Sequence, residues 1–432
     1  MAKYITIDEA LDLVKDNDYI VAGMCASEGR EFFTRLHEIS KRVNNITVDN
    51  CLPLMNYDYM ANAEYSNVFN VNSWFFSNDL RKSFKNGNIS FIPNQLHNAG
   101  VQRINYIKPN IFVGNATPPD ENGNVSLSLS NVYEKKMIAA ASIVILEINP
   151  LLPRTYGDLE VHESEIDYFV KIDSDVPVLP DILPNEKDKL IGNYVAEFIN
   201  DGDCIQLGIG GIPNAVAAAL GNKKDLGVHT EMLTTGFMDL YKAGVITNKK
   251  KSLHPGKMVC AFAFGTRELY DFLHENNDVI FLDGNYVNDP YIIGLNDNQI
   301  SINTTIEIDL TGQCCSESIG TAQFSGTGGQ CDTATGAQRS KNGKSFITLY
   351  STTMARNKAT GIKEEISKIV STLKPGAAVS LSRNDVDFVV TEYGAVNLKG
   401  RSIKERVDLL ISIAHPKFRE QLLKEAKEIG FI

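Results

Sequence analysis

The sequence predicts an α/β fold, built as two similar α/β domains with mostly parallel sheets. Short, nearly continuous apolar runs alternate along the chain with helical patterns, as parallel strands alternate with the helices that cover them. Three groups of residues from the first half recur in the same order in the second half, which indicates a duplicated unit. The length of 432 residues also exceeds a single ordinary hydrophobic core.

The expected elements follow the chain from its first residues. Thr6 and Glu9 form a capping box, which predicts that a helix begins there. The runs expected as buried strands are YIVAG (19–23), IFVGN (111–115), SIVILEI (142–148), CIQLGIG (204–210), VIFLDG (279–284) and DFVVTE (387–392). The stretches expected as helices are FFTRLHEIS (32–40), LIGNYVAEFIN (190–200), PNAVAAAL (213–220), EEISKIVSTL (364–373) and SIKERVDLLISIA (402–414).

Three internal echoes relate the two halves. They are DNDYIVAG (16–23) with DGDCIQLG (201–208), Asp120-x-x-Gly123 with Asp309-x-x-Gly312, and the strands that end in an acid at Glu147 and Glu392. The boundary falls in a proline-rich segment, SDVPVLPDILPNEKDK (174–189), whose composition is that of a linker. We therefore predict one domain over residues 1–184 and a second over residues 185–432.

Composition excludes several classes of protein. Hydrophobic residues make up 43% of the chain and charged residues 22%, which is typical of a packed globular protein. The net charge of −11 argues against nucleic acid or a membrane surface as partner. No apolar run is long enough to span a bilayer, and we expect no signal peptide. The seven cysteines never stand in CxxC spacing, so we expect reduced thiols in a cytoplasmic protein and no metal site.

Three glycine-containing segments resemble nucleotide-binding motifs in part, but none of them matches one. The segment that starts at Gly208 has Pro213 at the sixth position, where a dinucleotide fingerprint requires glycine, and the segment that starts at Gly326 has Cys331 there. The sequence before Gly343-Lys-Ser345 lacks the first glycine of a P-loop. What remains is a strand–GIGG–Pro–helix turn, whose backbone N–H groups can approach an anion or a developing oxyanion. The alternative is a tight turn that binds nothing.

Glu231 is the strongest candidate for chemistry. It stands where a short strand ends, between apolar Val228 and Met232, with no basic residue nearby in sequence. A partly buried, unpaired carboxylate is expensive, so one kept in such a place is a candidate nucleophile or general base. The alternative is a solvated surface residue. His229 is a candidate proton carrier or a structural hydrogen-bonding group, and a thiol nucleophile among Cys314, Cys315 and Cys331 has no partner histidine in view.

Several segments in order along the chain resemble the acetyl-CoA hydrolase/transferase family. They are LEINPLLPRTYGDLEVHESEIDYFV (146–170), residues 205–216, HTEM (229–232), QFSGTGGQCD (323–332) and VVTEYG (389–394) with the residues that follow it. Within the family, the chain is most similar to members that act on 4-hydroxybutyrate or butyrate. It departs from many members at Ala26–Arg30, where they carry a proline-rich stretch in the domain that helps to shape the acid pocket, and at Gly211–Asn214, where many have Ala-Ile-Pro-Asp.

The resemblance implies two similar α/β domains with the active site between them. It implies that Glu231 is the catalytic residue, and that CoA is a substrate, with no tightly bound cofactor. It also implies two groups of residues that bind CoA or stabilise an oxyanion: Gly208, Ile209, Gly210, Gly211 and Ile212 in the first turn, and Asn303, Gly326, Gly328 and Gly329.

Three hypotheses about function remain open. The leading one is a CoA-transferase, in which Glu231 carries CoA between a short-chain acyl-CoA and a carboxylate through a glutamyl-CoA thioester. The acids considered are 4-hydroxybutyrate, butyrate, propionate and succinate, with acetate as partner, in a fermentative setting. The second is an acyl-CoA hydrolase that uses the same glutamate with water as acceptor. The third is a CoA-binding module without turnover. A homo-oligomer, dimer or tetramer, is compatible with the sequence, but no motif bears on it.

Overall fold

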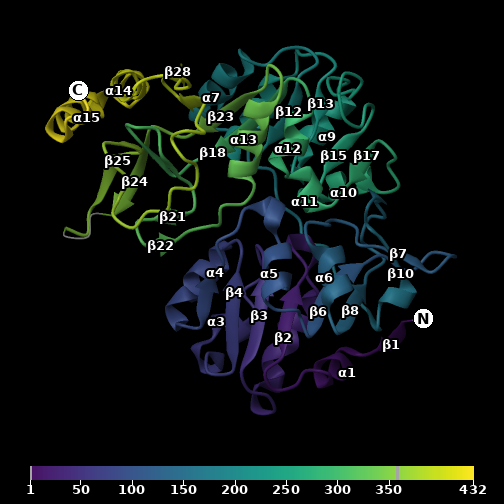
Figure 1. Cartoon of the computed structure of the whole chain (residues 1–432). Helices are drawn as coiled ribbons and strands as arrows, with labels where there is room; N and C mark the ends of the chain where they lie inside the picture. Colours follow the sequence, from purple (N-terminus) through teal and green to yellow (C-terminus); the bar gives the residue numbers. More distant parts are fainter. Residues whose placement is uncertain (1, 357–359) are drawn as a thin grey trace.

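The computed structural model describes residues 2–356 and 360–432. Its fold is α/β with mostly parallel strands, as the sequence predicts. Figure 1 shows two groups of elements, the first half in purple to blue around one sheet and the second half in teal to yellow around another. Within the described residues, no helix has the length and apolar character needed to cross a membrane.

The first half is built on a sheet of eight strands that all run parallel. Its central strands are buried on both faces, as their continuous apolar sequences predict. In spatial order the strands are β1 (Lys3–Ile5), β11 (Tyr168–Lys171), β8 (Ile143–Ile148), β6 (Ile111–Ala116), β2 (Tyr19–Ala22), β3 (Ile46–Asn50), β4 (Phe69–Ser73) and β5 (Ile89–Phe91). The helices between them include α1 (Ile7–Asp12), α2 (Arg30–Arg35), α5 (Val101–Tyr106) and α6 (Glu134–Ala140). The capping box of Thr6 and Glu9 starts α1, as predicted.

The second half has a sheet of six strands, of which only the edge strand β28 is antiparallel to its neighbour. In spatial order the strands are β13 (Gly227–Val228), β12 (Cys204–Leu207), β18 (Gln299–Thr304), β23 (Lys344–Thr348), β27 (Phe388–Thr391) and β28 (Gly394–Asn397). The helices include α7 (Glu186–Ala196), α8 (Gly211–Ala219), α13 (Gln330–Arg339), α14 (Ile403–Ser412) and α15 (Pro416–Ile429). The proline-rich residues 172–185 form neither helix nor strand.

The helix predicted over residues 364–373 is wrong. This segment forms β25 (Lys363–Ser367) and β26 (Ile369–Val370). β25 pairs antiparallel with β24 (Thr352–Arg356), and Ile369 of β26 is fully buried against Ile308. The β-branched residues suit a pleated surface, and pairing with strands distant in sequence decides the outcome over the local pattern.

The turn at Asp120 recurs at Asp309, whereas the predicted match between the strands that end in an acid is wrong. Glu147 is on β8, two strands from β2, but Glu392 follows β27, which is three strands from β12. The Asp120 and Asp309 carboxylates each accept hydrogen bonds from the backbone N–H groups two and four residues later. The glycines that follow, Gly123 and Gly312, have positive φ angles of 79° and 98°. The same turn is therefore built twice, as expected for a duplicated unit.

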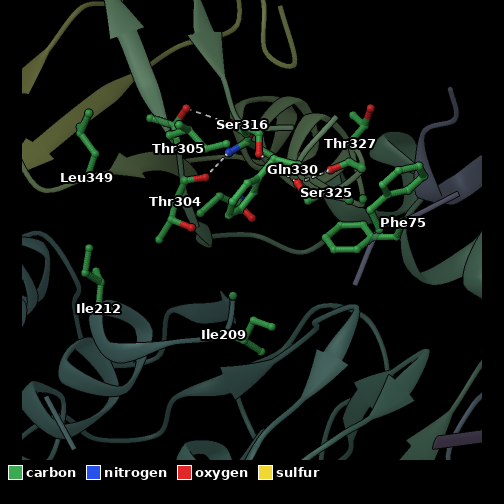
Figure 2. Close-up of a pocket in the computed structure, with 18 of the residues that line it drawn as sticks. Phe75, Ile209, Ile212, Thr304, Thr305, Ser316, Ser325, Thr327, Gln330 and Leu349 are labelled. Carbon is green, nitrogen blue, oxygen red and sulfur yellow. Dashed lines mark hydrogen bonds between the residues drawn. The ribbon is translucent and has the colours of Figure 1, made fainter. Parts of the chain in front are cut away.

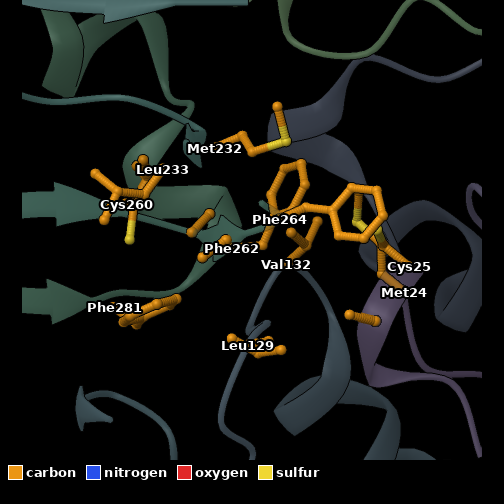
Figure 3. Packing of buried hydrophobic residues seen from close by; sticks show 14 of the residues in the cluster. Met24, Cys25, Leu129, Val132, Met232, Leu233, Cys260, Phe262, Phe264 and Phe281 are labelled. Atoms are coloured by element: carbon orange, nitrogen blue, oxygen red, sulfur yellow. The ribbon is translucent and has the colours of Figure 1, made fainter. Parts of the chain in front are cut away.

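The largest hydrophobic core passes from one half into the other (Figure 3). Met24 and Cys25, which follow β2 of the first sheet, belong to the same buried cluster as Met232, Phe262 and Phe264 of the second half. All five side chains are less than 9% exposed. The two halves are therefore joined by apolar packing close to Glu231, which precedes Met232 in the chain.

Candidate active site

A cavity of about 870 Å³ lies where the two halves meet. Residues of the first half that line it include Met24, Cys51, Leu52, Trp74 and Phe75. The second half contributes Glu231, Asn303 and residues of both glycine segments. Figure 2 shows Phe75 on one side of the cavity, with Ile209 and Ile212 on the opposite wall from Thr304 and Gln330. The structure thus brings Glu231, Asn303 and the predicted residues of both glycine segments to one cavity, except Gly210, which is not part of its lining.

Glu231 is held by its backbone and presents its side chain to the cavity. It follows β13, and its carbonyl accepts hydrogen bonds from the N–H groups of Ala261 and Phe262, both 3.0 Å long. Its carboxylate accepts a 2.9 Å hydrogen bond from Asn288 Nδ2, and no lysine, arginine or histidine of the described residues forms an ion pair with it. Burial raises the pKa of Glu231 to about 7, and the hydrogen bond from Asn288 partly opposes this shift.

The second glycine segment is wedged between Glu231 and the first half. A Cβ atom at Gly329 would lie 1.7 Å from Glu231 Oε2, and one at Gly326 would lie 2.3 Å from the carbonyl oxygen of Trp74. Hydrogen bonding from the Gly329 backbone stabilises the charged form of Glu231. Only glycine lets this backbone come so close to the carboxylate.

The first glycine turn is more open. Gly208 continues β12 by donating to the Ile302 carbonyl over 3.1 Å, and Gly210, with a φ angle of 112°, is the N-cap of α8. No atom lies within 4 Å of a Cβ placed at Gly210, whereas one at Gly211 would lie 2.6 Å from Asp188 Oδ2. Ile209 is 45% exposed and lines the cavity. The turn therefore has room beside its backbone.

Asn303 lines the cavity, but its side chain is engaged elsewhere. Its Nδ2 atom lies 2.9 Å from both Ser301 Oγ and Thr333 Oγ1, and it has no hydrogen bond with Glu231. His229 is buried outside the cavity lining, with Nε2 2.8 Å from the Val287 carbonyl oxygen. Burial lowers the pKa of His229 to about 3, which favours a neutral, hydrogen-bonded imidazole over a proton carrier.

The thiols do not resemble nucleophiles. Cys314 and Cys315 are fully buried outside the cavity lining, and burial raises the pKa of Cys331 to about 11. Among residues 2–356 and 360–432, no group of three or more His, Cys, Asp or Glu side chains is placed to hold a metal ion.

Sequence reasoning missed three polar residues near Glu231. Asn288 touches its carboxylate, Asp332 acts on its charge, and His97 of the first half is bonded to Asp332. Asn288 and His97 stand alone in unremarkable stretches of sequence, so no local pattern marks them. Two lysines of the cavity lining were also missed. Burial lowers the pKa of Lys368 to about 8, and Lys374 lies 3.3 Å from Glu307.

Comparison with known proteins identifies relatives along the whole chain. The acetyl-CoA hydrolase/transferase N-terminal domain matches residues 1–180, and the C-terminal domain of the same family matches residues 265–426. Succinyl-CoA:cyclohexane-1-carboxylate CoA transferase of Geobacter metallireducens is 41% identical, over 98% of this chain and 95% of that protein. The 4-hydroxybutyrate coenzyme A transferase of Clostridium kluyveri is 39% identical, over 99% of this chain and 97% of that protein.

Solved structures agree with this match. The crystal structure of RipA from Yersinia pestis superposes with a TM-score of 0.91 at 32% identity, covering 100% of this chain and 98% of that one. The chain therefore belongs to the acetyl-CoA hydrolase/transferase family. Acetyl-CoA hydrolases of Yarrowia lipolytica and Candida albicans are more distant, at 24–29% identity over 52–80% of the chain. The two relatives named above, which match along the full chain, are CoA-transferases, and this enzyme is of the CoA-transferase class.

Proposed function

We propose that the enzyme moves CoA between a short-chain acyl-CoA and a carboxylate such as acetate, with Glu231 as the nucleophile. The observation that carries this proposal is a lone carboxylate that opens on a cavity between the two halves, without a cation to pair it. A paired carboxylate would be a weaker nucleophile. Its relatives include a 4-hydroxybutyrate and a butyryl-CoA:acetate CoA-transferase, and these names support a short-chain acid as the acyl group.

The reaction preserves the energy of the thioester by passing it through the protein. The Glu231 carboxylate attacks the acyl-CoA carbonyl carbon, the C–S bond breaks, and CoA thiolate leaves behind an acyl-glutamyl anhydride. The thiolate then attacks the glutamyl carbonyl carbon, and the acid leaves as its carboxylate. The product is a glutamyl-CoA thioester. An incoming carboxylate reverses these steps and departs as the new acyl-CoA.

Each attack places negative charge on an oxygen that needs hydrogen-bond donors. The Gly329 backbone lies beside Glu231 and is well placed to supply one, Asn288 offers a side-chain amide, and Gly326 and Gly328 line the same cavity. One such donor is worth about 3–4 kcal/mol in other enzymes. Asn303 remains a candidate for CoA rather than for the oxyanion, because its amide faces Ser301 and Thr333.

CoA enters this scheme as a substrate, and no tightly bound cofactor is required. The open turn from Gly208 to Ile212 gives its backbone room to approach CoA, and Lys368 and Lys374 in the lining offer positive charge for its phosphates. The apolar side chains of Met24, Leu52 and Trp74 suit an aliphatic acyl group. The domain boundary at residue 184, a cytoplasmic location and a dimeric or tetrameric assembly are parts of the same proposal.

The test is a search for the covalent intermediate. The enzyme is incubated with butyryl-CoA alone, and its intact mass and peptides are measured, beside Glu231→Ala and the control Glu268→Ala, whose side chain is 72% exposed. We expect a CoA-sized adduct on the Glu231 peptide of the wild type and the control, absent from Glu231→Ala, and discharged by acetate as acetyl-CoA.

Other outcomes overturn the proposal in recognisable ways. An adduct that water discharges as fast as acetate does identifies a hydrolase. Absence of an adduct with every short acyl-CoA removes Glu231 from the role of nucleophile.

A further inference from the structure

A chain of polar groups leads from Glu231 into the first half of the molecule. Asn288 Nδ2 donates to Glu231 Oε2 over 2.9 Å, and the Asn288 side chain also stabilises the charged form of Asp332. Asp332 Oδ1 lies 2.7 Å from His97 Nδ1, while its other oxygen accepts a 3.0 Å hydrogen bond from the His97 backbone N–H. The imidazole thus holds a second carboxyl group close behind the candidate nucleophile.

These two residues come from opposite halves and meet at the glycine segment. Asp332 is in the first turn of α13, three residues after Gly329, and its side chain is 1% exposed. His97 is in the helical turn Leu96–Asn98, and its side chain is 24% exposed. The neighbouring Leu96 N–H donates to the Gly328 carbonyl over 3.0 Å. The pair therefore fixes the wall of the first half against the backbone that faces Glu231.

We propose that His97 and Asp332 are positioning residues for Glu231, and that their ion pair sets the charge and the orientation of its carboxylate. This inference rests on the proposed function, in which Glu231 is the nucleophile. It extends that function to two residues that do not line the cavity. They act on Glu231 through the Asn288 hydrogen bond and through the electrostatic effect of their charges on the Glu231 carboxylate.

The charges around the pair agree with a protonated imidazole. The hydrogen bond to Asp332 raises the pKa of His97, and the charge of Asp289 acts in the same direction. His97 Nε2 lies 2.9 Å from the Asn98 amide, which can turn its oxygen toward the protonated ring. The Cys331 thiol beside Asp332 stays neutral, because burial raises its pKa to about 11.

The sign of the effect on Glu231 follows from Coulomb's law. The Asp332 carboxylate repels a second negative charge and so raises the pKa of Glu231. Protonated His97 offsets this repulsion. Removing the Asp332 charge should therefore lower the pKa of Glu231. Removing His97 alone should raise it, because the Asp332 charge is then left without its partner.

The experiment measures the rate of adduct formation with butyryl-CoA in a single turnover, from about pH 5 to about pH 9. The acidic limb of this profile reports ionisation of Glu231. In Asp332→Asn, which keeps the shape of the side chain, we expect the limb to move to lower pH by roughly one unit. In His97→Gln we expect a smaller move to higher pH. The double variant should match Asp332→Asn, because the pKa of His97 is raised by Asp332 and the imidazole loses its charge when that carboxylate is removed.

A matched control and two contrary results make the test decisive. His37→Gln removes an imidazole that lies 3.7 Å from Asp58 at the surface, and it should leave the limb in place. The inference is overturned if the acidic limb of the Asp332→Asn profile stays at the wild-type pH or moves to higher pH. It is also overturned if the shift caused by His97→Gln is still present in the double variant. If His97→Gln fails to fold, Asp332→Asn decides alone. Absence of any adduct in the wild type overturns the proposed function as well, which separates the two failures.

Discussion

Two glutamates close to the junction of the halves, the buried Glu134 and the partly buried Glu231, have different surroundings. The Glu134 carboxylate is 1% exposed and accepts hydrogen bonds from the Met24 N–H, the Tyr133 N–H and the Ser130 hydroxyl, at 2.8–3.0 Å. Glu231 has one side-chain donor and opens on the cavity. A carboxylate whose lone pairs are occupied stabilises the fold, whereas one with free lone pairs beside a cavity can attack a substrate.

The largest effect is expected from replacing Glu231, the glutamate that the contrast with Glu134 identifies as the nucleophile. Glu231→Gln keeps the size of the side chain and removes the nucleophile, so kcat/KM for transfer from butyryl-CoA to acetate should fall by at least about 10⁴-fold. Urea unfolding should show a variant at least as stable as the wild type, because a costly buried charge is gone. Glu268→Gln serves as the control. Retained transfer in Glu231→Gln would place the reaction at another residue.

The next largest effect is expected at Gly329. In Gly329→Ala the new methyl group would lie 1.7 Å from Glu231 Oε2 and must displace that carboxylate. The kcat/KM for CoA transfer should therefore fall by about 10²–10³-fold. The protein should still fold, because the atom displaced is the end of a flexible side chain. Gly221→Ala, where the nearest atom is 3.7 Å away, should retain full activity. Equal activity of the two variants would contradict the close approach.

Glu134 should respond in stability rather than in chemistry. In Glu134→Gln an amide NH₂ group replaces a carboxylate oxygen that accepts hydrogen bonds from backbone N–H groups, so donor faces donor. We expect this change to lower the free energy of unfolding by about 2 kcal/mol. Urea denaturation measures this change, and mass analysis should still detect the CoA adduct on Glu231. If Glu134→Gln is fully stable but forms no CoA adduct, Glu134 takes part in the reaction and the contrast with Glu231 fails.

The smallest effect concerns pH. Since the pKa of Glu231 is raised to about 7, the nucleophile is protonated below that pH, and kcat/KM should rise as pH increases through about 7. The native state then binds this proton more tightly than the unfolded chain, whose glutamate has its ordinary pKa of 4.5. Stability from this group is therefore lost as pH rises from 4.5 to about 7. Glu231→Gln should lack that part of the slope, as urea midpoints across pH can show.

Much of the fold and part of the site could be predicted from the sequence. Continuous apolar runs identify buried strands, and an acid among apolar neighbours identifies Glu231. Local pattern misassigned residues 364–373, because their partners in β24 and at Ile308 come from other parts of the chain. It also missed His97 and Asp332, which are separated by 235 residues and meet only after both halves have folded.

The core that passes from Met24 to Phe264 has a consequence for how the chain can be divided. A cut in the segment 172–185, which forms neither helix nor strand, breaks no element of either sheet. Each fragment would nevertheless expose part of that core to water. We expect the two fragments to aggregate when expressed separately and to reassemble when expressed together. In the intact chain the halves should unfold in one cooperative transition, so duplication of the unit has produced mutual dependence rather than two independent modules.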